Sequence, residues 1–234
     1  MGKIGCGYGS EWHLLRYIGY HRAYFSDLIL NHIGGQSLLW HDFRFLPPNR
    51  SNKQDGEIIG LSFLENAQAD TAWRSFWPQS GNAHNWDAVG EIWENGQREW
   101  LLVEAKAHLG EINSSCGASS QHSLSMISAA LSQTIGSFCK SPSPVESWLS
   151  PYYQYANRLA MLHFLTEECD PPIPAQLLFI YFTGDRRPDG AKCPQTSADW
   201  EHDITAMEHH LGIDSESVLY SRVHRIILPI NPEQ

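Results

Sequence analysis

An Asn-Gly pair at positions 95 and 96 separates two apolar runs, and this arrangement predicts a β-hairpin. Both residues tolerate the positive φ angles of a type I′ turn, so the pair is a strong short-range hairpin signal. Strands are expected over residues 86–93 and 99–107. Folding the chain about the turn sets the register, in which the facing pairs are Ile92 with Glu99, Gly90 with Leu101, and Asp87 with Glu104.

This register brings like charges together at one end of an otherwise apolar hairpin. Cβ atoms of facing residues lie roughly 4.5–5.5 Å apart, and two carboxylates there need a compensating cation. Lys106 shares the face of Glu104, because side chains alternate along a strand. Hard divalent ions prefer carboxylate and water oxygens. Asp87, Glu104 and Lys106 therefore predict a metal-dependent hydrolytic site, in which the lysine orients water or neutralises developing charge.

The segments around these residues resemble the PD-(D/E)XK nuclease superfamily. They read Trp-Asp-Ala-Val-Gly over 86–90 and Leu-Leu-Val-Glu-Ala-Lys over 101–106, and the superfamily places an Asp on one strand and Glu-x-Lys on the next. The resemblance implies a restriction-endonuclease-like α/β fold, with a central mixed β-sheet flanked by helices. It also implies Asp87 and Glu104 as ligands of Mg²⁺ or Mn²⁺ and Lys106 as the catalytic lysine. Trp86 departs from the pattern, since it stands where the superfamily name has Pro.

Many members of this superfamily add an acid from the first core helix. Glu11 is a candidate, because it follows the expected helix start at Ser10. The helix dipole alone also favours a carboxylate in a first turn, which is an equally good explanation of Glu11. Glu57 and Glu65 are its rivals for the role.

The resemblance also suggests a supporting residue outside the hairpin. Gln154 lies on a helix after the hairpin, where a glutamine supports the site in exonuclease-like members, although a solvated helix face explains it more simply. His108 and Glu111 follow Lys106 closely, but a surface role is the better explanation for both.

Other chemistries find weaker support. Three histidines on a late helix and Cys193 could bind zinc, although an exposed polar helix face explains them better: His202, His209 and His210. Four aromatic residues could stack nucleobases, but they are more simply core side chains: Trp73, Phe76, Trp77 and Trp86. No glycine-rich phosphate loop, dinucleotide fingerprint or nucleophile elbow occurs in the sequence.

Length and composition predict one globular domain over residues 1–234. The five cysteines are widely spaced and form no Cys-x-x-Cys motif, which argues against a disulfide framework and favours a reducing cytoplasm. No apolar run approaches the roughly 20 residues of a membrane span, and the first residues lack the apolar core of a signal peptide.

The net charge of −10 argues against indiscriminate binding of nucleic acid, which requires clustered Lys and Arg. Local basic patches are possible at three places, although an ordinary solvated surface explains each of them: Arg44, Arg50 and Lys53; Arg186, Arg187 and Lys192; Arg222 and Arg225.

Apolar periodicity and turn residues predict helices alternating with strands. Helices are expected over 10–31, 67–76, 124–139, 151–168 and 197–211, and extended segments over 37–46, 176–182 and 223–230. Residues 57–64 are expected to form either a strand or a strand that runs into a short helix. The continuous apolar run at 176–182 is typical of a strand buried on both faces. This order predicts a mixed sheet covered by helices.

The sequence thus favours a nuclease that hydrolyses nucleic-acid phosphodiester bonds, with DNA as the substrate by family analogy alone. A catalytically inactive member of the fold, acting as a binding or interaction module, is the main alternative, and a zinc-binding regulator is a third. No membrane partner is expected, and a homodimer stays an open alternative.

Overall fold

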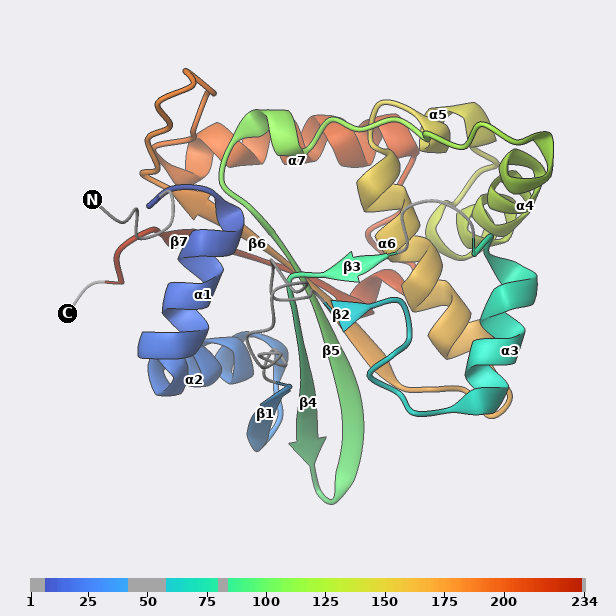
Figure 1. The fold of residues 1–234 in the computed structure, drawn as a ribbon, viewed down its shortest axis with the longest axis horizontal. Helices are drawn as coiled ribbons and strands as arrows, with labels where there is room; N and C mark the ends of the chain where they lie inside the picture. Colours follow the sequence, from blue (N-terminus) through green and yellow to red (C-terminus); the bar gives the residue numbers. More distant parts are fainter. Residues whose placement is uncertain (1–6, 42–57, 80–83, 233–234) are drawn as a thin grey trace, which may run out of the picture.

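The computed structural model describes residues 7–41, 58–79 and 84–232. Within these residues, the main sheet has five strands in the spatial order β1 (Ser37–His41), β4 (Ala88–Glu94), β5 (Gln97–Lys106), β6 (Ala175–Thr183) and β7 (Val223–Pro229) (Figure 1). The strands β1, β4 and β5 pair antiparallel, whereas β5, β6 and β7 pair parallel. The predicted α/β class with a central mixed sheet flanked by helices is therefore confirmed.

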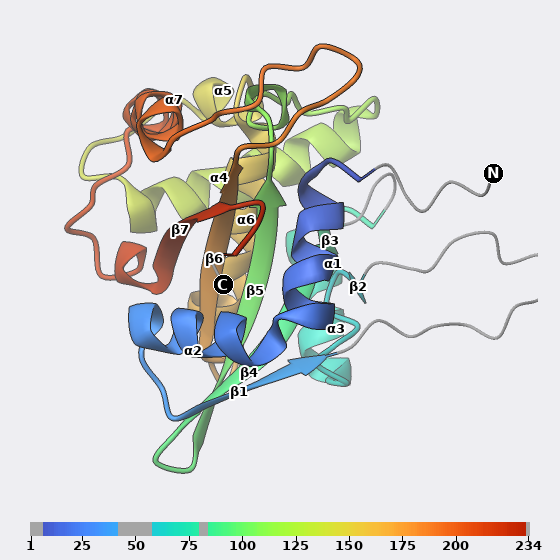
Figure 2. The same ribbon diagram turned by 90° about the vertical axis from the view of Figure 1, so that its left-hand side faces the viewer.

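Helices cover both faces of this sheet (Figure 2). On one face lie α1 (Ser10–Tyr20) and α2 (Arg22–Ile33), whose buried side chains join one core cluster. The other face is covered by α4 (Gln121–Phe138), α6 (Tyr153–His163) and α7 (Ser197–Leu211), and the short helices α3 (Ala67–Phe76) and α5 (Val145–Leu149) pack into the same second cluster. In β6, which lies between β5 and β7, side chains alternate between the two clusters, so this strand is buried on both faces as predicted.

The hairpin has the predicted turn and register. Asn95 and Gly96 have φ angles of 51° and 79°, as a type I′ turn requires, and Gly90 faces Leu101. The first hairpin strand begins later than expected, at Ala88. Residues before it form β3 (Asn85–Trp86), which pairs with β2 (Ile58–Ile59) in a separate two-stranded sheet.

The predicted single helix over 10–31 is wrong, because the helix is interrupted at His21. This residue has φ −113° and ψ 26°, outside the helical region, and its N–H donates to the carbonyl groups of Arg16 and Tyr17. The bend lets two short helices pack on one face of the twisted sheet. The expected helix cap at Ser10 is also wrong, since Gly9 precedes the first turn and the Ser10 hydroxyl donates to Glu111 Oε1 over 3.0 Å.

The other elements differ from expectation mainly at their ends. The helices over 67–76 and 197–211 are confirmed. The helix α4 begins at Gln121, because Ser120 accepts a hydrogen bond from the N–H of Ser123 and caps it. The helix α6 begins at Tyr153 and continues beyond His163 as a π-helical turn. Residues 42–46 of the expected first extended segment lie outside the described residues. In the described part of the chain, no helix combines the length and apolar character needed to cross a bilayer.

Candidate functional site

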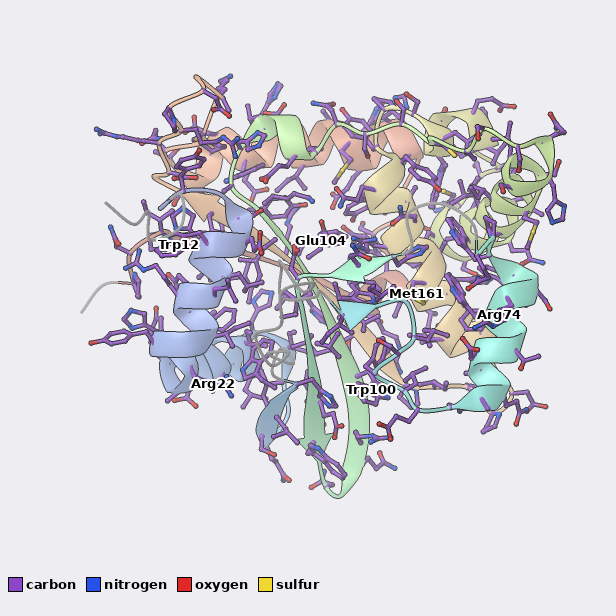
Figure 3. The ribbon with its side chains drawn as sticks, in the orientation of Figure 1. Trp12, Arg22, Arg74, Trp100, Glu104 and Met161 are labelled. Carbon is purple, nitrogen blue, oxygen red and sulfur yellow. The ribbon has the colours of Figure 1, made fainter. Side chains whose placement is uncertain are left out.

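The alternation of side chains along β5 points the predicted site residues toward α6. Trp100 and Leu102 lie in the cluster under α4 and α6, whereas Leu101 and Val103 face the other helix layer. Glu104 follows the same alternation, and it lies near the centre of the molecule (Figure 3). Its exposed fraction is 2% and that of Lys106 is 8%. The paired register of the hairpin ends at Ala88 and Val103, and the N–H of the preceding residue, Asp87, donates to the Val103 carbonyl over 3.2 Å.

Asp87 sits where the chain leaves the main sheet. Its Oδ2 accepts a hydrogen bond of 2.7 Å from the backbone N–H of Ala105 in β5. The side chain thus takes the place of a backbone partner, because β4 begins only at Ala88. Burial and, second, the nearby negative charge of Glu104 raise the pKa of the Asp87 carboxyl to about 7. The predicted juxtaposition of two carboxylates is therefore present, and it disfavours the ionised form of Asp87.

Glu104 is held between two cations. Its Oε1 accepts a hydrogen bond from the Lys106 ammonium, and its Oε2 accepts one of 2.8 Å from Arg158 Nε and forms an ion pair of 2.8 Å with Nη2 of the same side chain. Burial alone would raise the pKa of Glu104. The charges of Arg158 and Lys106 outweigh burial and hold this pKa below its ordinary value. Glu104 is thus an ionised carboxylate in the protein interior.

Arg158 is a site residue that the sequence did not single out. It is 4% exposed, and beyond Glu104 it donates to the Asn85 carbonyl over 2.7 Å and to Asn157 Oδ1 over 2.9 Å. Its guanidinium carbon lies 4.8 Å from the centre of the Trp86 ring. A buried glutamate requires a cation, and that requirement was the signal available in the sequence.

Gln154 lies one helical turn before Arg158 on α6, so both side chains face the sheet. Its Oε1 accepts a hydrogen bond of 2.9 Å from Lys106, and its own N–H is anchored on the Ser114 hydroxyl over 2.7 Å. The structure thus brings Gln154 into direct contact with the predicted catalytic lysine. The helix α6 therefore supplies a partner for each of two charged residues of β5: Arg158 for Glu104 and Gln154 for Lys106.

A cleft of about 990 Å³ opens beside these residues. Among its described lining residues, three side chains carry charge, namely Asp87, Glu104 and Arg158. Burial and the nearby Arg158 lower the pKa of His84, which also lines the cleft, to about 3, so this imidazole is neutral. The remaining lining side chains are uncharged and include serines, asparagines, Trp77 and Gln154.

The expected additional acids do not lie on this cleft. Glu11 and Glu65 are both exposed, and neither belongs to the residues that line it. Glu57 lies outside the described residues. Glu111 is closer to the site, because it lines a small cavity together with Glu104 and Gln154.

Glu111 has a structural role at the end of β5. Its Oε2 accepts hydrogen bonds from the N–H groups of Ala107 and His108, over 2.5 and 3.1 Å, and its Oε1 accepts the Ser10 hydroxyl. It therefore ties the start of α1 to the segment that follows Lys106, rather than lying on a solvated surface.

Most of the aromatic residues considered for base stacking belong to the core. Trp73 is 4% exposed and Trp86 is fully buried, and Phe76 packs against the same cluster. Trp77 is buried as well, although it contributes to the wall of the cleft. The simpler core explanation is therefore confirmed for these residues.

Zinc binding finds no donor set in the described part of the chain, where no group of three or more His, Cys, Asp or Glu side chains could hold a metal ion. The His202 side chain is 86% exposed.

A Mg²⁺ or Mn²⁺ site at the cleft would have two carboxylates, Asp87 and Glu104, completed by backbone oxygen and water. This set suits Mg²⁺, which keeps several of its waters and takes one or two carboxylates. Burial and, to a lesser extent, repulsion from Glu104 raise the pKa of Asp87, and a bound cation would offset both effects.

Three of the four arginines in two expected basic patches are paired with acids, namely Arg187, Arg222 and Arg225. Arg187 forms an ion pair with Asp189 over 2.5 Å, and Arg222 with Glu99 over 3.3 Å. Arg225 contacts both Glu201 and Glu208. The third patch, at Arg44, Arg50 and Lys53, lies outside the described residues.

We expect Asp87→Asn to stabilise the metal-free protein at high pH. The folded state holds the Asp87 proton more tightly than the unfolded chain, so the free energy of unfolding falls as pH rises from about 4 to about 7. The asparagine still accepts the Ala105 N–H but does not ionise. In urea unfolding with EDTA, the variant should exceed wild type at pH 8 by at least about 1.4 kcal/mol, the equivalent of one pKa unit. A difference that does not shrink at pH 5 would contradict this assignment.

No protein-family model, curated protein or solved structure matches this chain. The case for a function therefore depends on the geometry of the side chains around Glu104.

Proposed function

We propose that this protein is a metal-dependent nuclease of restriction-endonuclease-like architecture, which hydrolyses phosphodiester bonds in nucleic acid. One observation carries the proposal: Asp87, directly beyond the last pair of the hairpin, lies near Glu104 where both line a cleft large enough for part of a nucleic-acid strand, and Lys106 contacts Glu104. Their order along the two strands is that of the PD-(D/E)XK motif. DNA is the proposed substrate by analogy with that superfamily.

In this proposal Asp87 and Glu104, which both line the cleft, would hold Mg²⁺ or Mn²⁺. The ion supplies positive charge for the attacked phosphate and lowers the pKa of a water molecule. Lys106 positions the attacking water and balances the negative charge that develops on the phosphate. Gln154 fixes the direction of the Lys106 ammonium through its hydrogen bond of 2.9 Å.

The test is cleavage of plasmid DNA and of short single-stranded and duplex DNA with Mn²⁺, repeated with EDTA. Products that form with Mn²⁺ and disappear with EDTA support the proposal. A folded protein that cleaves none of these substrates, nor RNA, with Mg²⁺ or Mn²⁺ would refute it.

Gln154→Ala should lower the cleavage rate by about tenfold, since proton-transfer groups contribute most when they are correctly oriented. The loss should appear in kcat more than in KM, because Gln154 contacts the lysine and is not proposed to contact the substrate. Ser119→Ala, which removes an exposed polar side chain from the lining of the same cleft, is the control for general damage to the cleft wall. Equal losses in the two variants would argue against a specific role for Gln154.

A catalytically inactive binding module is the second candidate, and one observation favours it. Both oxygens of Glu104 are already engaged by Arg158 and Lys106, an arrangement that is complete without an ion. The net charge of −10 and the paired surface arginines point the same way. Failure to bind Mn²⁺ by a protein that still binds nucleic acid would favour this module.

A further inference from the structure

The partners of Glu104 restrict how it can receive a metal. Oε2 accepts a hydrogen bond of 2.8 Å from Arg158 Nε and also lies 2.8 Å from Nη2 of the same guanidinium, in a buried ion pair. The other oxygen accepts from Lys106. A divalent ion that approaches Glu104 therefore meets two cations as well as the carboxylate.

The charges around the site already balance. Asp87 and Glu104 supply two negative charges when both are ionised, and Lys106 and Arg158 supply two positive ones. Like charges repel strongly when buried, because the effective dielectric constant is low. The arrangement therefore weakens binding of a free divalent ion, unless one of the cations moves away from Glu104.

Arg158 is the cation placed to move. Among the described residues that line the cleft it is the one cation, whereas Lys106 lies outside that lining. Its contacts with the Asn85 carbonyl, Asn157 Oδ1 and the Trp86 ring do not involve Glu104. These contacts would keep the guanidinium at the wall of the cleft after it leaves the carboxylate. The planar fork of a guanidinium matches a phosphate as well as it matches a carboxylate.

We infer that Arg158 couples metal binding to substrate binding, by exchanging the Glu104 carboxylate for a phosphate of the nucleic acid. This inference rests on the proposed nuclease function. Without substrate, Arg158 occupies Glu104 and the metal binds weakly. With substrate, the phosphate takes Arg158 and frees Glu104 for the ion. Because binding free energies are linked, the metal must strengthen substrate binding by the same factor.

The experiment measures Mn²⁺ affinity by electron paramagnetic resonance of the free ion. Wild-type protein is titrated alone and with saturating 12-nucleotide phosphorothioate DNA, single-stranded and duplex, and Mn²⁺ bound by the DNA alone is subtracted. We expect at least one of the two DNA forms to tighten Mn²⁺ binding at least tenfold. Unchanged Mn²⁺ affinity with both forms would overturn the coupling and leave the proposed nuclease function standing. No Mn²⁺ binding under any condition would overturn both.

Variants assign the effect to Arg158. Arg158→Met should bind Mn²⁺ at least tenfold more tightly than wild type without DNA, and added DNA should change that affinity less than twofold. Arg74→Met removes the same charge from the outer side of α3 (Figure 3), where the side chain is 59% exposed, and should behave as wild type. Weak, DNA-dependent Mn²⁺ binding by folded Arg158→Met would overturn the inference. If Arg158→Met does not fold, as judged by circular dichroism, the wild-type comparison decides alone.

Discussion

Glu104→Ala is expected to destabilise the folded protein by about 3–5 kcal/mol, because it leaves buried cations without their shared partner. Arg158 and Lys106 are 4% and 8% exposed, so water can solvate the two unpaired charges only in part. The loss should be largest at neutral pH. It should shrink in acid, since the depressed pKa of Glu104 means that its stabilising charge is lost as pH falls through the folded-state value. Urea unfolding of the metal-free protein measures the effect.

Glu99→Ala provides the matched control on the same strand. Glu99 pairs with Arg222, but both side chains are about one-third exposed, 33% and 34%. An ion pair this open to water contributes about 0–1 kcal/mol. Similar losses of stability in the two variants would mean that burial does not strengthen the Glu104 cluster, contrary to our description.

Lys106→Ala is expected to lower the rate of metal-dependent cleavage by about 10²- to 10⁴-fold, the usual contribution of a positioned proton-transfer group. Mn²⁺ binding should persist, because the lysine is not a proposed ligand and its removal takes a positive charge away from Glu104. Cleavage is followed on plasmid DNA, and Mn²⁺ binding is followed by paramagnetic resonance. This combination separates a catalytic role from a loss of the metal site.

Lys140→Ala is the control for the change of one lysine, since Lys140 is exposed just after α4. It should cleave at the wild-type rate. Undiminished cleavage by Lys106→Ala would remove Lys106 from the mechanism, and loss of Mn²⁺ binding in that variant would point to a structural role instead.

The hairpin and its charged end could be predicted because they depend on local chemistry. Asn95 and Gly96 fix the turn, the turn fixes the register as far as Ala88 and Val103, and Asp87 comes directly before this last pair, near Glu104. The buried strand β6 was readable from its apolar run for a similar reason. Each of these features is determined by residues close together in the sequence.

The rest of the site depends on contacts between distant parts of the chain. Arg158 is separated from Glu104 by 54 positions in the sequence. No local sequence pattern predicts which helix packs over β5. The break at His21 has the same origin, because apolar spacing continues through it and packing on the sheet decides the bend. The position of Glu11 away from the cleft follows from how α1 is tied down by Glu111.

The parallel pairing of β5 with β6 has a consequence for how the protein folds. Parallel neighbours need a long crossover, and here that crossover carries α4, α5 and α6. The hairpin needs only its own turn, whereas closing the crossover costs chain entropy before long-range contacts compensate for it. Asp87, Glu104 and Lys106 therefore belong to a part of the chain that can form early, and Arg158 arrives with a part that forms late. Asp87 and Glu104 are therefore exposed to solvent early in folding, and Glu104 gains its ion pair with Arg158 only when α6 packs on the sheet.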